Sequence, residues 1–254
     1  MIIIKNVQLR ESFSGVVGQS RNARMSVAAA SATATFLADE LIVEESGGRQ
    51  YRLTSFSKTI NLATTGAGGM DTGSVPTTGF VALYAIYNPT TATSALLAVN
   101  ATNANVREVY GGTNMPAGFT ASALVAVWGV ESGQFIIGDL VGRILSIQQV
   151  TVLSTSSPVS TATPISLVNT VPLNAKAVSG LMSASAGGSS NIYNIAIDVA
   201  PRKNMVGRTR VANSGTNITG IFKIQLTEPS TIYYAGSAVG TTNSSSVYVT
   251  SYEI

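Results

Sequence analysis

The stretch from Gly79 to Val106, GFVALYAIYNPTTATSALLAVNATNANV, limits the possible folds more than any other part of the chain. Its longest apolar run, Phe80 to Tyr87, ends at Asn88-Pro89, whereas a membrane-spanning helix needs about 20 largely apolar residues in succession. A short apolar run with a glycine before it and Asn-Pro after it favours a strand that is buried on both faces. The stretch therefore predicts buried β-structure and no membrane span.

The overall composition indicates a folded protein with an unusually uncharged surface. Charged residues make up 11% of the 254 residues, against about 25% in an average soluble domain. Disordered chains combine low hydrophobicity with high charge, but this chain is 45% hydrophobic, so disorder is excluded. Because so few charges cannot cover the surface of a monomer, we expect much of that surface to be buried against other copies of the chain.

The remaining sequence is also typical of β-structure. Two strand-like runs, Thr33–Glu44 and Arg49–Phe56, flank Gly47-Gly48 and predict a hairpin. The best helix candidate, Ala23–Ala32, is rich in alanine but lacks an apolar stripe of helical period. After residue 165, short strand-like runs recur at the spacing expected of an antiparallel sandwich. The sequence therefore predicts an all-β fold of antiparallel β-sandwich domains.

One segment has the composition of a linker. Residues Ser154 to Pro164, STSSPVSTATP, are rich in serine, threonine and proline, as exposed connections are. We therefore expect three parts: an N-terminal segment with the hairpin over 1–60, a first β-sandwich over 61–150, and a C-terminal β-sandwich over 165–254.

The chemistry available to the chain is restricted by two missing residue types. There is no cysteine and no histidine, which excludes disulfides, Cys/His zinc sites, thiol nucleophiles and a histidine base. Two acidic doublets, Asp39-Glu40 and Glu44-Glu45, do not form catalytic pairs, because neighbours along a strand point to opposite faces. We therefore expect no enzyme, no metal site and no cofactor.

The net charge of +3 arises mainly near the C-terminus. The densest basic group consists of Arg202, Lys203, Arg208 and Arg210. A nucleic-acid-binding surface needs a larger basic excess with interleaved aromatic residues, so no nucleic-acid partner is expected. The group has two interpretations, a solvated strand face or a site that binds phosphates.

Tyrosines cluster in the same part of the chain, as Tyr233-Tyr234 and as Tyr248 and Tyr252. A tyrosine offers a flat apolar face with a polar tip, which suits a core, a subunit interface or a sugar ring. Packing in the core or between subunits is the first interpretation, and ligand contact is the second.

The N-terminal sequence MIIIKNVQLRESF does not have the pattern of an export signal. Its run of isoleucines is too short for the apolar region of a signal peptide, and no small-residue cleavage site follows. We therefore expect synthesis in a cytoplasm without export by the usual route.

Three stretches resemble tail-fibre proteins of tailed bacteriophages and prophages. They are RNARMSVAAASATATFLADELIVE, YRLTSFSKTINLATTGAGGMDTGSVPTTGFVALYAIYNPTT and GGTNMPAGFTASALVAVWGV, and the resemblance runs from about residue 20 to residue 130. The resemblance implies a homotrimeric, receptor-binding part of a virion that contacts a bacterial surface polysaccharide, lipopolysaccharide or protein. It transfers no catalytic or binding residue, because such fibres share scaffold motifs and no active site.

Within such a fibre, the N-terminal segment is expected to attach to other tail or baseplate proteins and the C-terminal sandwich to form the receptor-binding tip. Neutral polar loops would bind sugar hydroxyls, a tyrosine face would cover the ring, and the basic group would meet phosphates. The expected contacts are Tyr233, Tyr234, Asn213, Asn217 and Asn243, with Arg202, Lys203, Arg208 and Arg210. Two alternatives stay open: a capsule or polysaccharide depolymerase, and a purely structural tail connector.

Overall fold

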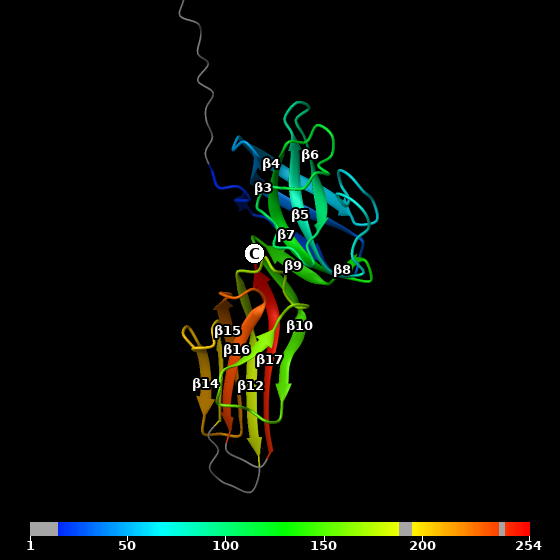
Figure 1. Cartoon of the computed structure of the whole chain (residues 1–254). Helices are drawn as coiled ribbons and strands as arrows, with labels where there is room; N and C mark the ends of the chain where they lie inside the picture. Colours follow the sequence, from blue (N-terminus) through cyan, green and yellow to red (C-terminus); the bar gives the residue numbers. More distant parts are fainter. Residues whose placement is uncertain (1–14, 188–194, 239–241) are drawn as a thin grey trace, which may run out of the picture.

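The structure of the chain, a computed structural model, describes residues 15–187, 195–238 and 242–254, and these residues form β-strands and no helix. The strands are β1 (Ser20–Arg21), β2 (Arg24–Val27), β3 (Thr33–Glu45), β4 (Gln50–Asn61), β5 (Thr78–Asn88), β6 (Thr93–Asn100), β7 (Ala121–Glu131), β8 (Gln134–Phe135), β9 (Gly138–Val141), β10 (Ile144–Thr155), β11 (Thr163–Ser166), β12 (Ala177–Gly187), β13 (Ile195–Ala200), β14 (Thr209–Asn213), β15 (Asn217–Gln225), β16 (Thr231–Ala238) and β17 (Thr242–Glu253). Strands β2 to β9 gather at one end of an elongated molecule and β10 to β17 at the other (Figure 1).

The half built from β1 to β9 is one curved antiparallel sheet. Its strand order is β9-β2-β3-β7-β5-β6, and β4 also pairs with β3, with which it forms a hairpin. The predicted hairpin is confirmed, since Glu44 pairs with Gln50 across Gly47-Gly48. Gly48 adopts a φ of +83°, a conformation that glycine enters without steric cost.

The apolar run from Phe80 to Tyr87 lies at the centre of this half. Every residue from Phe80 to Ile86 in β5 is buried, as is every residue from Ala121 to Val130 in β7. The prediction of a strand buried on both faces is confirmed, because β5 pairs with β6 and β7 while the β3–β4 hairpin contributes Phe36 and Phe56 to the same core. Strand β6 returns antiparallel to β5, from Asn88↔Thr93 to Val81↔Asn100.

The half built from β10 to β17 is a sandwich of two antiparallel sheets. One sheet has the order β15-β12-β17-β10 and the other β11-β16-β13-β14. Side chains such as Met182 and Val247 from the first sheet, and Ile197 and Ile232 from the second, are buried in the core between them. The predicted antiparallel sandwich is confirmed for this part of the chain.

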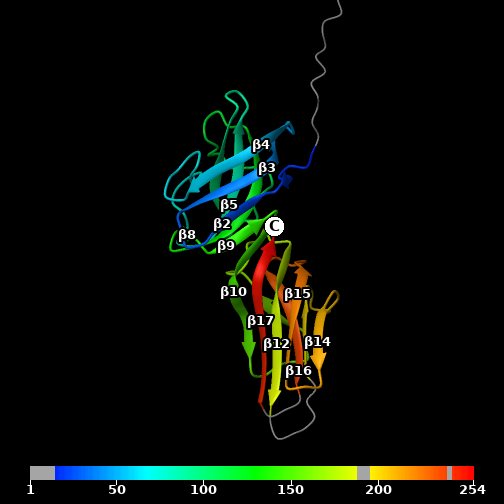
Figure 2. The same cartoon turned by 180° about the vertical axis from the view of Figure 1, so that it is seen from behind.

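The two halves share strand pairing, which Figure 2 shows from behind. Ile144 at the start of β10 pairs with Val141 of β9 on one side and with Glu253 of β17 on the other. The sheet therefore continues from one half into the other as a single 13-stranded sheet. Tyr252, which is 1% exposed, donates a hydrogen bond of 2.8 Å to the carbonyl of Val127 in the first half.

Of the two expected domain boundaries, the one at residue 60 lies within a strand and the one at 150–165 includes a connection between strands. Residue 60 lies near the end of β4, within one continuous sheet and core, while 150–165 covers the end of β10, a connection and the start of β11. Residues 1–14, the start of the expected attachment segment, lie outside the described residues. The helix candidate Ala23–Ala32 contains β2 and no helix. Among the described residues, no helix is long and apolar enough to cross a membrane.

Candidate functional site

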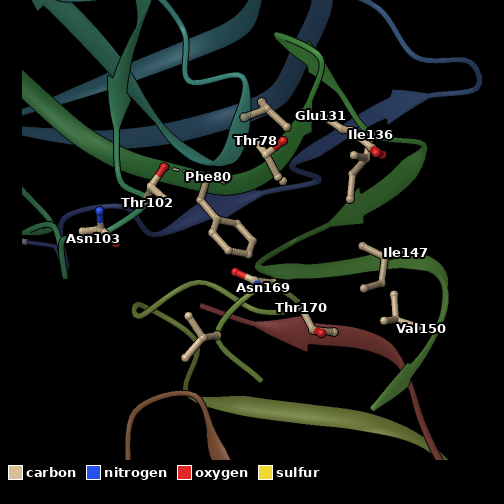
Figure 3. Close-up of a pocket in the computed structure, with 14 residues that line it drawn as sticks. Thr78, Phe80, Thr102, Asn103, Glu131, Ile136, Ile147, Val150, Asn169 and Thr170 are labelled. Atoms are coloured by element: carbon tan, nitrogen blue, oxygen red, sulfur yellow. Dashed lines mark hydrogen bonds between the residues drawn. The ribbon is translucent and has the colours of Figure 1, made fainter. Parts of the chain in front are cut away.

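A pocket of about 330 Å³ lies where the two halves meet (Figure 3). We call it the junction pocket. One wall comes from the start of β5, the end of β7 and the segment after β6, and the other from β10 and the segment after β11. Its described lining residues are Thr78, Gly79, Phe80, Thr102, Asn103, Gly129, Val130, Glu131, Ile136, Ile147, Val150, Val168, Asn169 and Thr170.

A close backbone approach shapes one side of the junction pocket. Gly79 has a φ of +143°, and a Cβ atom at this position would collide with the side chain of Thr102. The backbone N–H of Phe80 donates a hydrogen bond of 3.2 Å to the Thr102 hydroxyl. Glycine therefore allows the segment after β6 to lie against the start of β5, and Figure 3 shows the Phe80 ring directed toward the opposite wall.

The polar groups of the junction pocket are mostly neutral. Hydroxyls and amides are contributed by both walls, from Thr102 and Asn103 on one side and Asn169 and Thr170 on the other, around an apolar floor that includes Ile147. Binding sites for small molecules commonly combine apolar walls with a few placed polar groups, at volumes of about 300 to 1,000 Å³. The arrangement suits a neutral ligand with several hydroxyl groups.

Sequence reasoning did not single out these residues. The available signal was that Thr78, Gly79 and Asn103 lie at the ends of strongly apolar strands, where polar side chains collect at a sheet edge. Nothing in the sequence indicated that the segment after β11 would face them.

The structure separates the predicted basic group into two pairs. Arg208 and Arg210 lie beside the buried carboxylate of Asp198, each with one nitrogen 3.7 Å from an oxygen. Arg202 and Lys203 are exposed in the turn between β13 and β14. Half of the predicted group is therefore held by an acidic residue that the sequence analysis did not connect with it.

Three of the predicted contact residues line one shallow hollow. Arg210, Asn213 and Asn217 come together where β14 turns into β15. We call this the hairpin hollow. Asn243 was expected in a loop, but it lies within β17, where it pairs with Ala186; Thr241, the start of that expected loop, is outside the described residues. The neighbouring pair, Ser185 of β12 and Ser244 of β17, is joined by a hydrogen bond of 2.6 Å between the two hydroxyl groups.

The tyrosines have different environments. Tyr234 is 5% exposed and lies in the core, so it does not offer its ring to a ligand; core packing, the first interpretation, applies to it and to Tyr252. Tyr233 is only partly buried and donates a hydrogen bond of 2.8 Å to Glu228, which raises the pKa of the Tyr233 phenol. Tyr248 is half-buried on the outer face of β17.

The arrangement of the described residues does not support two kinds of site, a carboxylate metal site and a Ser-Lys nucleophile. Within residues 15–187, 195–238 and 242–254, no three carboxylates are grouped to hold a metal ion. Ser55 and Lys58 have the Ser-x-x-Lys spacing of some serine nucleophiles, which sequence reasoning overlooked. They lie on β4, where Ser55 has a φ of +51°, and none of the hydrogen bonds of the described residues joins the two side chains.

Comparisons with known proteins do not assign the chain to a family. No family model matches the chain, and no curated protein matches it significantly.

Proposed function

We propose that this chain is a non-catalytic tail-fibre protein of a virion, which binds a bacterial surface glycan or lipopolysaccharide as a homotrimer and thereby mediates host adsorption. The observation that carries the proposal is the junction pocket, in which neutral hydroxyl and amide groups surround an apolar floor. Sugars present the complementary combination of hydroxyl groups and apolar ring faces. The resemblance of residues 20–130 to tail fibres supplies the biological setting.

The single carboxylate of the junction pocket supports binding of a glycan without its hydrolysis. Glu131 is the single carboxylate among the described residues that line it. Glycoside hydrolases act with two carboxyl groups about 5 to 10 Å apart. A site with one carboxylate is suited to orient a ligand through a hydrogen bond.

The outer face of the sheet β15-β12-β17-β10 supports the homotrimer. Leu181 pairs with Ile221 on one side and with Tyr248 on the other, and these three side chains form a cross-strand row. Ile221 is 77% exposed. The adjacent row consists of Ser183, Thr219 and Ser246, which are small and uncharged. An apolar row within such a face is the composition expected of a buried subunit contact. We call Ile221, Leu181 and Tyr248 the apolar row.

The hairpin hollow is a second candidate for the glycan site. It is favoured by the convergence of Arg210, Asn213 and Asn217 at a turn, as expected from the sequence. Its residues lie on one hairpin, whereas the junction pocket draws on both halves of the molecule and encloses a ligand more fully.

Binding to immobilised bacterial polysaccharides and lipopolysaccharides, measured by biolayer interferometry, tests the proposal. The full chain is expected to bind at least one of them. A double variant of the junction pocket, Asn103→Ala with Asn169→Ala, should lose about tenfold or more in affinity, the loss expected when hydrogen bonds to a ligand are removed. The matched double variant of the hairpin hollow, Asn213→Ala with Asn217→Ala, should retain it.

The opposite pattern would move the site to the hairpin hollow. Failure of the unmodified protein to bind any surface glycan would favour the structural connector. A halo that spreads around protein spotted on a bacterial lawn would reveal polysaccharide cleavage and favour the depolymerase.

A further inference from the structure

A second pocket, distinct from the junction pocket, lies on the outer face of the sheet β11-β16-β13-β14. Its volume is about 230 Å³, and we call it the Asp198 pocket. The described residues that line it are Ser160, Asp198, Met205, Arg208, Arg210, Ala235, Gly236 and Ser237. They come from β13, β14 and β16, the connection before β11 and the turn after β13.

The fold buries Asp198 on a face that would otherwise be exposed. Asp198 pairs with Ala235 of β16 and Arg210 of β14, so it sits on a central strand. The connection before β11 runs beside β16, where the N–H of Gly236 donates a hydrogen bond of 2.7 Å to the carbonyl of Val159, and it contributes Ser160 to the pocket. The turn after β13 contributes Met205 and Arg208 to the same pocket. Asp198 is consequently only 6% exposed, although alternation along β13 places it opposite the core residues Ile197 and Val199.

The carboxylate of Asp198 is charged and buried but poorly satisfied. Arg208 Nε lies 3.7 Å from Oδ1 and Arg210 Nη1 lies 3.7 Å from Oδ2, distances beyond those of a hydrogen bond. Oδ1 is buried and has no hydrogen-bond partner among the described residues. A buried carboxylate in this state is stabilised by any donor that reaches it, and a hydroxyl group is such a donor.

The arginines require a different group. Their side chains are 49% and 47% exposed, so each keeps donors available to the pocket, and the cluster of two arginines and one aspartate has a net charge of +1. A carboxylate placed between the guanidiniums would neutralise this charge and accept their hydrogen bonds. Asp198 disfavours a ligand that is only an anion, and the arginines disfavour a metal cation.

From this arrangement we infer that the Asp198 pocket binds a hydroxycarboxylate, with a ligand hydroxyl donating to Asp198 and the ligand carboxylate held by Arg208 and Arg210. Uronic acids of acidic polysaccharides and free small hydroxy acids both have this chemistry. The serine hydroxyls of Ser160 and Ser237 are placed to bind further hydroxyl groups, which a sugar has and a small acid lacks. The inference is independent of the proposed fibre role and of the junction pocket.

Titration of the full chain with sodium glucuronate, glucose, propionate and lactate, followed by isothermal calorimetry and by NMR of the arginine Nε–H groups, tests the inference. Glucuronate is expected to bind about tenfold more tightly than glucose or propionate, because each lacks one of the two groups that are recognised. Lactate distinguishes the sources: affinity equal to that of glucuronate identifies a small hydroxy acid, and weaker binding identifies an acidic sugar. Equal responses to glucuronate, glucose and propionate, or none, would overturn the inference and leave the cluster as an ion pair.

Two variants separate recognition from folding. Asp198→Asn keeps the shape of the side chain but removes its charge. The affinity of this variant for propionate should therefore equal its affinity for glucuronate. Arg210→Ala should weaken glucuronate binding about tenfold. Arg24→Ala, which removes an exposed arginine from β2 in the other half, is the matched control and should bind like the unmodified protein. Near-ultraviolet circular dichroism verifies that each variant is folded, and a folded Asp198→Asn variant with unchanged selectivity would contradict the assigned role of the carboxylate.

Discussion

Arg143 donates from a single guanidinium nitrogen to both carboxylate oxygens of Glu108, at 2.8 Å and 3.0 Å. The same guanidinium donates through Nε to the main-chain oxygen of Ile254, at 2.9 Å. One side chain therefore connects the turn between β9 and β10, the segment before β7 and the end of the chain. Figure 1 marks the C-terminus at the junction of the two halves.

Replacement of Arg143 by methionine should lower the free energy of unfolding by about 2 to 3 kcal/mol, since it removes hydrogen bonds to a charged partner and leaves a partly buried main-chain oxygen unpaired. Arg143→Lys should recover only part of this, because one ammonium cannot reach all the acceptors of the planar guanidinium. Urea denaturation measures both variants, with the exposed Lys203→Ala as the control. A methionine variant as stable as the unmodified chain would show that the contacts are not stabilising.

Tyr252→Phe tests the second connection between the halves. The variant removes only the phenolic hydroxyl, which donates 2.8 Å to the carbonyl of Val127, and leaves that buried carbonyl without its donor. We expect a loss of about 1 kcal/mol in the free energy of unfolding. Tyr248→Phe, on the outer face of the same strand, is the matched control and should change stability less.

Stability should decrease at alkaline pH because of Tyr110. Burial, followed by its hydrogen bond to Asp71, raises the pKa of Tyr110 from 10.0 to about 12. Between these values the unfolded chain loses the phenolic proton while the folded chain keeps it, so the unfolded state is favoured as pH rises. The stabilisation is fully present below pH 10 and is lost as pH rises toward 12.

Denaturant titrations at several pH values measure this effect. Tyr110→Phe should be less stable at neutral pH, because it lacks the hydrogen bond to Asp71, and should have a shallower dependence on pH above 10. An unchanged slope in the variant would assign the alkaline transition to other groups, of which Tyr84 and Tyr252 also have pKa values raised by burial.

The apolar row provides the test of the trimer. Ile221→Asp places a charge in the row and should lower the association constant by at least about tenfold, as measured by sedimentation velocity. Val206→Asp is the matched control: Val206 is 62% exposed but lies in the turn after β13, away from the row. If both variants and the unmodified chain sediment as monomers, the trimer is wrong.

The sequence was informative where local patterns decide structure. The apolar run around β5 and the glycine pair between β3 and β4 each reflect a strand's immediate environment, and both were predicted correctly. The burial of Asp198 was not predictable in this way, because alternation places it on the outer face of β13 and the pocket around it is completed by other segments, including Ser160 from the connection before β11. The junction pocket was missed for the same reason, since its walls are brought together by the pairing of β9 with β10.

Strand β10 also has a mechanical consequence. Its first residues, Ile144 to Ile147, pair with β9, and most of its length pairs with β17. The two ends of the molecule are therefore joined by a paired strand. A force applied at one end would be transmitted to the other end through these rows of interstrand hydrogen bonds. We therefore expect the two ends to move together, with little bending at the junction.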